Sequence, residues 1–336
     1  MLTIVSIFDE YDNMTTRLPA RRGVRRVLAL AAGSAALLAL SGCAALTGAG
    51  DTGGRVDVVT SFYPMEFLVE RIGGRHVAVD TLTKPGAEPH DLELSPRQTG
   101  RLGEADVVVY VKGLQPAVDA AVAQSDVPHV VEATSLAAPD APRDADGEHH
   151  DAHATDGDGH GHGAKDPHLW LDPVQYARVA QGVGKALGEA DPDHRADYRR
   201  NTETLVRRLR ALDREYAEGL ADTTSRTLVT HHAAFGHLAA RYGLREESLT
   251  GPDPESGASA ARLRELHRIV AEEKVTTVFT EPLAGDKTVR TLAADLNLRT
   301  DVLDPLEGIT DASRGDDYFE VMRANLTALR TALGAR

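Results

Sequence analysis

Short runs of β-branched and apolar residues recur along the chain, with amphipathic stretches between them. Such runs are typical of buried strands, and helical stretches between them indicate βαβ units with a parallel sheet. Four strands are predicted near residues 55–60, 77–83, 107–111 and 129–132, and four more near residues 226–230, 245–249, 275–280 and 299–303. The predicted fold class is therefore α/β, with two (β/α) lobes and mainly parallel sheets.

The region between the two groups of strands has a helical pattern. Asp172 and Pro173 form an N-cap followed by proline at the first helical position, which opens a helix to about residue 190. Asp191 and Pro192 begin a second helix, whose apolar stripe continues to about residue 220. At about 1.5 Å per residue, its roughly 28 residues would extend about 42 Å. This helix can therefore join the two lobes as a stiff connection. Further amphipathic helices are predicted near residues 258–272 and 317–333.

The N-terminal region has the pattern of a secretory signal. Five arginines precede an apolar run over residues 27–40, and small residues lead from there to Cys43. The run is shorter than the roughly 20 residues that a membrane span needs. The sequence Leu-Ser-Gly-Cys that ends at Cys43 resembles the bacterial lipobox, whose cysteine becomes the lipidated first residue. We expect residues 1–42 to be removed as a lipoprotein signal peptide, and the Gly-rich residues 43–54 to form a flexible tether.

Composition excludes several classes of protein. The 336 residues include 37 Lys and Arg against 51 Asp and Glu, which gives a net charge of −14. This balance argues against a nucleic-acid partner, because phosphate binding depends on clustered basic residues and the dense arginine cluster lies near the N-terminus. A single cysteine excludes a disulfide framework, and 42% hydrophobic residues exclude overall disorder. The unusual feature is the content of 14 histidines.

Five of these histidines crowd into the polar segment 143–165. Because the segment has almost no apolar residues, we expect a mobile loop of the first lobe. Imidazole suits Zn, Cu and Ni, and a flexible His and Asp tract can bind such ions loosely. The alternative is a solvated polar linker. The expected weak sites are His149, His150, His153, His160 and His162.

Three other histidines lie in loops beside predicted strands or helices. His90 and His232 follow strands, His168 precedes the first long helix, and Glu307 follows the last strand. In open α/β sheets, ligands bind beyond the carboxyl ends of the strands, so a cleft between the lobes could gather all four. Three imidazoles and one carboxylate complete a tetrahedral zinc site, and nitrogen ligands favour Zn over Mn, Mg or Ca. Without an open position, such a site binds rather than catalyses.

Four segments around these residues carry a family resemblance. They run from Pro89 to Pro96, from Asp166 to Pro173, from Val229 to Phe235 and from Leu303 to Gly308. Together they resemble the metal-binding lipoprotein components of bacterial ABC importers, specifically the zinc group, over essentially the whole mature chain. The resemblance implies two (β/α) lobes bridged by a long rigid helix, with Zn²⁺ bound in the cleft between them and an ABC permease as the partner that receives it.

The resemblance places the three histidine ligands of the family on His90, His168 and His232. The manganese members of the family have a carboxylate at the third position, so an imidazole there supports zinc. The neighbouring His231 is an alternative, and we favour His232 because it directly precedes Ala-Ala-Phe. Glu307 matches the fourth ligand, which Asp304 or a water molecule could replace.

Several carboxylates are candidates to hold the ligand imidazoles by a second hydrogen bond, namely Asp91, Asp166, Asp172 and Glu281. Four further histidines are expected at the surface: His76, His129, His194 and His267. Trp170, two residues after His168, is expected to line the metal pocket.

The expected organisation is an N-terminal lobe over residues 55–171, linking helices over 172–222 and a C-terminal lobe over 223–336. We expect a lipid-anchored monomer at the outer face of the cell membrane, which captures Zn²⁺ and delivers it to the permease. The alternatives are a manganese importer component, a surface zinc buffer or adhesin, and a secreted zinc hydrolase. A hydrolase would need a His-Glu-x-x-His helix or a general base beside an open zinc position, and the motif does not occur. The protein is therefore not expected to be an enzyme.

Overall fold

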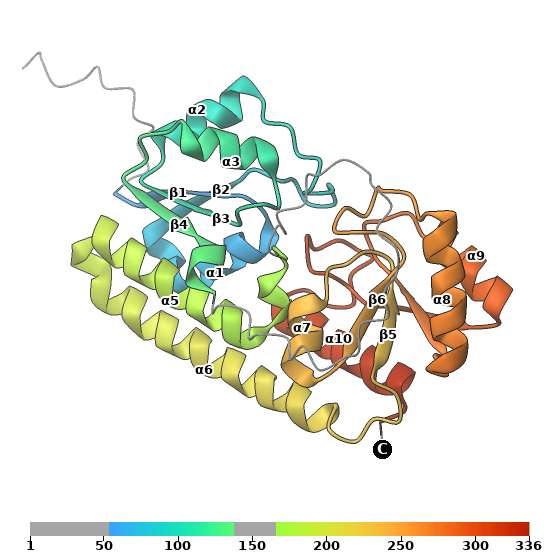
Figure 1. Cartoon of the computed structure of the whole chain (residues 1–336). Coiled ribbons are helices and arrows are strands. Elements are labelled where there is room, and N and C mark those ends of the chain that lie inside the picture. Colours follow the sequence, from blue (N-terminus) through green and yellow to red (C-terminus); the bar gives the residue numbers. More distant parts are fainter. Residues whose placement is uncertain (1–53, 138–165, 336) are drawn as a thin grey trace, which may run out of the picture. The chain divides into compact units, whose positions relative to one another are not determined.

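The computed structural model describes residues 54–137 and 166–335, which contain two four-stranded parallel sheets (Figure 1). The first sheet has the order β2-β1-β3-β4 and the second β6-β5-β7-β8. The strands are β1 (Val56–Thr60), β2 (Val77–Thr81), β3 (Val107–Tyr110), β4 (His129–Glu132), β5 (Thr227–Thr230), β6 (Arg245–Ser248), β7 (Thr277–Thr280) and β8 (Arg299–Val302). The predicted fold class is confirmed. Four strands end at the predicted residue, and β2, β3, β6 and β8 end one or two residues before it.

Helices cover both faces of the first sheet. They are α1 (Tyr63–Gly73), η1 (Gly74–His76), α2 (Pro96–Glu104), α3 (Pro116–Ala123) and α4 (Ala133–Leu136). Val58 and Val107 belong to a core shared with α1, whereas Val59 and Val108 belong to a core with α2 and α3. This alternation follows from the two-residue period of a strand. Both faces of the central strands β1 and β3 are therefore buried, as their continuous valine runs require.

Two long antiparallel helices follow the short η2 (Leu169–Leu171). Asp172 caps α5 (Pro173–Ala190) by accepting hydrogen bonds from the main-chain nitrogens of Val174 and Gln175, as predicted. The predicted 28-residue helix is wrong at its start, because residues from Pro192 to His194 form the turn η3 before α6 (Arg195–Gly219) begins. The 25 residues of α6 extend about 38 Å.

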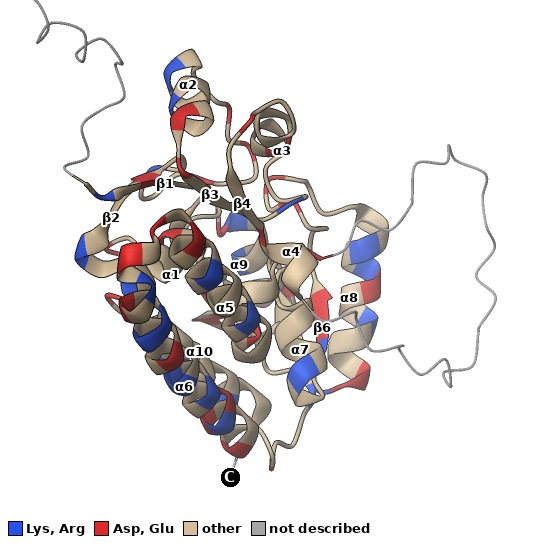
Figure 2. Ribbon diagram, turned by 90° about the vertical axis from the view of Figure 1, so that its left-hand side faces the viewer, with Lys and Arg blue, Asp and Glu red and all other residues tan. Residues whose placement is uncertain are grey.

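The helix α6 connects the two lobes. Its apolar stripe, which includes Tyr198, Leu209 and Tyr216, is buried. The helix packs against α5 and α1 of the first lobe and against α10 (Tyr318–Leu333) of the second. Figure 2 shows Lys, Arg, Asp and Glu interspersed along its outer side. The predicted connection by a long helix is therefore confirmed.

The second sheet is also covered on both faces. The helices are α7 (Gly236–Tyr242), α8 (Ala260–Glu272), α9 (Lys287–Leu296) and α10. Val229 and Val278 pack in one core with residues of α8 and α9, whereas Leu228 and Phe279 belong to the core that includes α10. The helices predicted near residues 258–272 and 317–333 correspond to α8 and α10.

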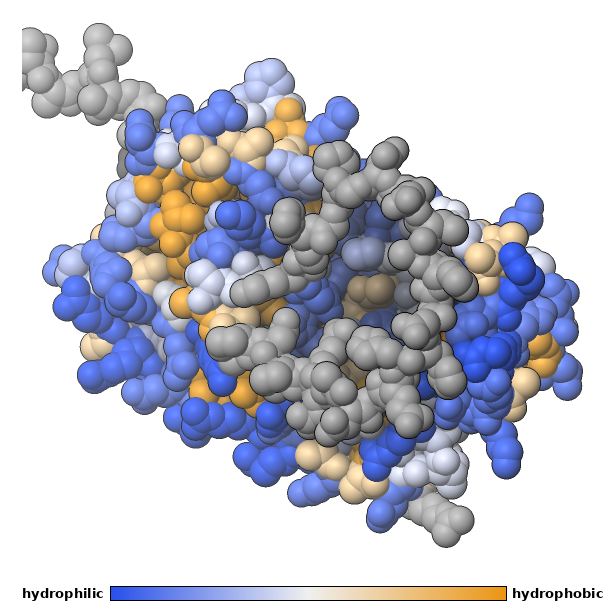
Figure 3. All heavy atoms as spheres, viewed as in Figure 1, coloured by the Kyte–Doolittle hydropathy of each residue, from blue (hydrophilic) through white to orange (hydrophobic). Residues whose placement is uncertain are grey.

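Hydrophilic residues make up most of the surface that Figure 3 draws in colour, with smaller hydrophobic patches between them. Within the described ranges, Val130 on the edge strand β4 is the one large hydrophobic residue that is exposed. None of the helices in these ranges is long and apolar enough to cross a membrane. The predicted signal peptide, Cys43, the tether up to residue 53 and the His-rich segment 143–165 lie outside the described residues.

Candidate metal centre

Four side chains from both lobes converge at one point. His90, His168, His232 and Glu307 each offer one ligand atom, and these four atoms lie within 4.8 Å of one another. Among the described residues, no other group of three or more His, Cys, Asp or Glu side chains meets this condition. The structure thus brings together the four predicted ligands, although 217 positions separate His90 from Glu307 in the chain.

The parallel sheets explain why these four residues meet. His90 lies in the loop between β2 and α2, and His168 immediately precedes η2. His232 lies two residues beyond β5, and Glu307 lies in the loop beyond β8. The carboxyl ends of parallel strands meet at one edge of a sheet, where loops can build a site without disturbing the core. Each lobe therefore contributes two of the four side chains.

The distances around Glu307 match a four-coordinate zinc site. Its Oε1 atom lies 3.2 Å from Nε2 of His90, and 3.5 Å from Nε2 of both His168 and His232. With zinc bonds of about 2.0–2.1 Å, two ligands of a tetrahedral site are about 3.3–3.4 Å apart. The three separations are close to this value, so a small ion can contact all four atoms after small side-chain shifts.

Two buried ring nitrogens support a metal at this position. Nε2 of His168 and Nε2 of His232 have no hydrogen-bond partner, although both atoms are buried. Unpaired buried polar atoms are rare in folded proteins because they lose water without gaining a partner. A bound cation would satisfy both nitrogens.

The other nitrogen of each buried ring is held by a carboxylate. Nδ1 of His168 lies 2.8 Å from Oδ1 of Asp166, and Nδ1 of His232 lies 2.6 Å from Oε2 of Glu281. A hydrogen bond at Nδ1 fixes the ring and directs the lone pair of a neutral Nε2 toward the centre. Asp166 and Glu281 therefore have the predicted orienting contacts. Asp91 is exposed and Asp172 caps α5, so the prediction is wrong for these two.

These contacts change the pKa values of the metal-free side chains. Burial opposes protonation of His168, but Asp166 and Glu307 outweigh it and raise its pKa to about 9. Burial likewise opposes protonation of His232, and Glu281 and Glu307 raise its pKa to about 11. Burial also opposes ionisation of Glu307, yet the three imidazoles hold its pKa well below the ordinary value. Without metal at pH 7, the centre therefore holds two imidazolium rings around a carboxylate.

Access to the centre lies on the side of His90. The His90 side chain is 10% exposed, whereas those of His168 and His232 are fully buried and that of Glu307 is 1% exposed. The ring centroids of the three histidines are 5.3–5.8 Å apart. Trp170 closes one side, with its ring centroid 5.2 Å from that of His168, as predicted for a residue lining the pocket.

Glu88 is a neighbour of the centre that the sequence analysis missed. Its Oε1 accepts a hydrogen bond of 3.2 Å from the main-chain nitrogen of His90. Burial and the nearby Glu307 raise the pKa of Glu88 to about 8. The available signal was its position two residues before a predicted ligand.

The two alternative ligands lie outside the converging group. His231 is adjacent to His232, but its Nδ1 is 3.9 Å from Oε2 of Glu281 and it is not among the four. Asp304 directs its Oδ1 to the main-chain nitrogen of Leu306, at 2.7 Å. The geometry therefore favours His232 and Glu307 over these neighbours.

One prediction about the remaining histidines is wrong. His76 was expected at the surface, but its side chain is 12% exposed and its ring stacks on that of His194 with centroids 3.8 Å apart. Each ring also has a carboxylate partner, Asp197 for His76 and Asp191 for His194. Among the described residues, neither ring belongs to a group that could hold a metal ion. His267 is exposed as predicted.

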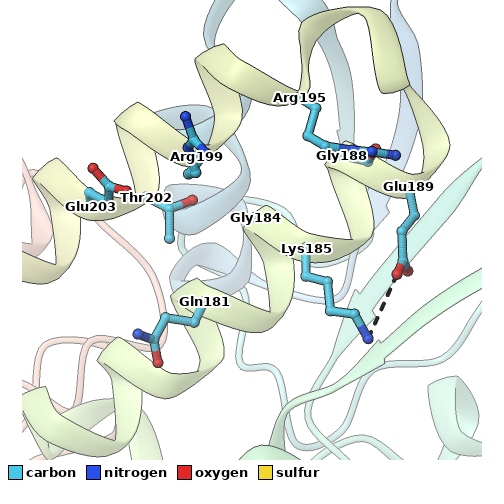
Figure 4. A pocket seen from close by; sticks show the side chains of 9 residues that line it. All are labelled: Gln181, Gly184, Lys185, Gly188, Glu189, Arg195, Arg199, Thr202 and Glu203. Atoms are coloured by element: carbon cyan, nitrogen blue, oxygen red, sulfur yellow. Dashed lines mark hydrogen bonds and ion pairs between the residues drawn. The ribbon is translucent and has the colours of Figure 1, made fainter.

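A separate surface hollow of about 510 Å³ lies between α5 and α6 (Figure 4). Its lining mixes cations such as Arg195 with anions such as Glu189, which pairs with Lys185 at 3.7 Å. Gly184 permits close helix packing there, since an added Cβ would meet Oγ1 of Thr202 at 2.1 Å. None of the four converging side chains lines this hollow.

Comparison with known proteins identifies relatives. The zinc-binding lipoprotein AdcA of Streptococcus pneumoniae is 33% identical over 280 residues, which cover 82% of this chain and 56% of AdcA. The chain thus spans little more than half the length of AdcA. The high-affinity zinc uptake system protein ZnuA of Bacillus subtilis is 30% identical over 304 residues, which cover 88% of this chain and 94% of that protein.

Solved structures agree with these matches. The crystal structure of the Zn(II)-bound ZnuA-like domain of S. pneumoniae AdcA matches with a TM-score of 0.67 and 31% identity, covering 83% of this chain and 99% of that domain. The ZnuA family model, described as zinc-uptake complex component A periplasmic, matches residues 58–332. Since that match includes both lobes and all four converging residues, the chain belongs to the ZnuA family.

Proposed function

We propose that this protein captures Zn²⁺ outside the cytoplasm and delivers it to an ABC permease. The observation that carries the proposal is the convergence of three imidazole nitrogens and one carboxylate oxygen at separations suited to four-coordinate zinc. The names of the relatives, which describe zinc binding and zinc uptake, support the same ion.

In this proposal, His90, His168, His232 and Glu307 are the zinc ligands. They fill all four positions of a tetrahedral ion, which leaves no site for an activated water. The role is therefore binding and release rather than catalysis. Opening at the His90 side would allow the ion to enter or leave without unfolding either lobe.

We further propose that the protein is a monomer tethered to the membrane through lipid on Cys43, with residues 1–42 removed. The lipobox-like sequence supports the anchor, and the name of the AdcA relative includes the word lipoprotein. We retain the predicted lobes at residues 55–171 and 223–336, with linking helices at 172–222. Residues 43–54 would act as the tether.

Competition between zinc and manganese tests the proposed function. We expect the mature protein to bind Zn²⁺ in preference to Mn²⁺, because three of the four ligands are nitrogens. The measurement is calorimetric titration of each ion alone, followed by zinc titration in excess manganese. A preference for Mn²⁺ would overturn the assignment, as would hydrolase activity of the zinc-loaded protein.

Deletion of residues 144–164 separates the His-rich segment from the centre. We propose that its five histidines bind additional ions weakly, because imidazoles on a polar tract offer ligands without fixed geometry. The deletion is expected to leave one tight zinc event unchanged and to remove only the weak events in the calorimetric titration. Loss of the tight event would show that the segment supplies a ligand to the main site.

Zinc binding is also expected to release protons. At pH 7, His168 and His232 are protonated in the metal-free protein, because their pKa values are about 9 and about 11. Both rings must lose a proton to bind zinc, so about two protons leave at pH 7. The affinity rises steeply with pH up to about 9, where His168 loses its proton, and less steeply up to about 11, where His232 does. Calorimetry in two buffers of different ionisation enthalpy measures the number released. An enthalpy that is independent of the buffer would contradict the expected protonation.

A further inference from the structure

The loop that presents Glu307 is held by a residue distant from every ligand motif. Asn325 lies on α10 and is 2% exposed. Its Nδ2 donates to the main-chain oxygen of Asp304 at 2.7 Å, and its Oδ1 accepts from the main-chain nitrogen of Asp304 at 2.9 Å. The side-chain amide thus bonds both main-chain polar groups of one loop residue, as a neighbouring strand would.

The contact with Asp304 continues toward Glu307. The side-chain Oδ1 of Asp304 accepts from the main-chain nitrogen of Leu306 at 2.7 Å. Leu306 has a φ of 59°, in the left-handed region that a leucine rarely adopts. Such a conformation persists only when the surrounding contacts enforce it. The bonds from Asn325 and Asp304 are contacts of this kind, and they lie directly before the ligand.

The first lobe holds the same loop from the other side. Nε1 of Trp170 donates to the main-chain oxygen of Pro305 at 2.8 Å, and Trp170 is fully buried. Trp170 is itself fixed, because its main-chain oxygen accepts from the hydroxyl of Tyr318 at 2.7 Å. The residues before Glu307 are therefore held at their main-chain atoms by both lobes.

This support determines how Glu307 can approach the ion. One oxygen, Oε1, makes all three approaches of 3.2–3.5 Å to the imidazoles. A carboxylate held in this way offers one oxygen to a four-coordinate ion. A loop that could relax would allow two-oxygen contact or entry of water, which suits ions of higher coordination number.

We infer that Asn325 is a positioning residue for Glu307 and that its hold on Asp304 favours four-coordinate zinc over manganese. The inference rests on the proposed function and on the assignment of Glu307 as a ligand. It extends that site to α10, for which the sequence predicted only an amphipathic helix.

The test compares N325L with the parent protein. Leucine has a similar size but cannot bond either main-chain group of Asp304. We expect zinc affinity to fall about 10- to 100-fold, as is typical when a residue that supports a metal ligand is lost. Manganese affinity should change less, so the ratio of zinc affinity to manganese affinity, here called the metal ratio, should fall. Cobalt(II), used as a spectroscopic probe, should lose the intense visible absorption of a four-coordinate ion.

Two further variants separate positioning from general destabilisation. L329A truncates a fully buried leucine of the same helix, so it should lower the unfolding temperature but keep the metal ratio and the cobalt spectrum of the parent. N325D retains an oxygen that can accept from the Asp304 nitrogen and loses the donor. It should give an intermediate ratio, and it replaces N325L if that variant does not fold.

The outcomes distinguish this inference from the proposed function. A parent protein without a preference for zinc would refute the proposed function. A parent that prefers zinc, with N325L or N325D showing the same metal ratio and cobalt spectrum, would refute only the role of Asn325. Equal changes in L329A and N325L would also refute it, because both would then reflect lost stability.

Discussion

Replacing His232 with alanine is expected to abolish tight zinc binding, whereas replacing His231 leaves most of it. His232 is fully buried, directs Nε2 to within 3.5 Å of Oε1 of Glu307 and is oriented through Nδ1 by Glu281. A structural zinc site is worth about 10–16 kcal/mol over four ligands, so one ligand corresponds to a loss of about 100- to 1,000-fold. Direct zinc titration with a competing chelator measures this change.

His231 provides a matched control because it is the same residue type one position away. It is also largely buried, yet it lies outside the converging group. Both variants remove one imidazole and create a similar small cavity, so a loss of stability alone should affect them alike. If H231A lost more affinity than H232A, the assignment of the third ligand would have to be reversed.

Replacing Glu307 with glutamine should weaken zinc binding and destabilise the metal-free protein. The variant keeps an oxygen near the three rings but loses the charge that compensates the imidazolium groups of His168 and His232. Removing one partner of a buried ion pair typically lowers the free energy of unfolding by about 3–5 kcal/mol. The loss is smaller here to the extent that the two rings give up their protons and no longer carry an uncompensated charge. We expect a lower unfolding temperature without metal, lower zinc affinity and release of fewer than two protons on binding.

Replacing Asp304 with asparagine tests whether Asp304, rather than Glu307, is the fourth ligand. D304N retains an oxygen that can accept from the main-chain nitrogen of Leu306 and leaves the main-chain bonds to Asn325 in place. It should therefore lose far less zinc affinity than E307Q. If D304N were the more damaging of the two, Asp304 would be the better candidate for the fourth ligand.

The sequence predicted the strands and the loops because their signals are local. A run such as Val107 to Tyr110 indicates a buried strand by itself, and Asp172 followed by Pro173 indicates where a helix begins. His90, His168 and Glu307 were identifiable for the same reason, because each stands in a short motif next to such an element. The turn at η3 was missed because the same proline signal opens both a short turn and a long helix.

The choice between neighbouring candidates depended on tertiary contacts. The sequence favoured His232 over His231 only because it directly precedes Ala-Ala-Phe. The contact that orients His232 toward the centre comes from Glu281, 49 residues away. Asn325 had no signal, since an asparagine on an amphipathic helix carries no information about a loop that it contacts.

By itself, the sequence determined two parallel α/β lobes, the long connecting helix and the residues from which a zinc centre could be built, because hydrophobic period, caps and motifs act over a few residues. The tertiary structure alone decided which side chains meet, which ring nitrogens remain unpaired and how the Glu307 loop is held by Asn325 and Trp170. Those contacts join residues that are up to 217 positions apart, so they exist only once both lobes have folded and packed along α6.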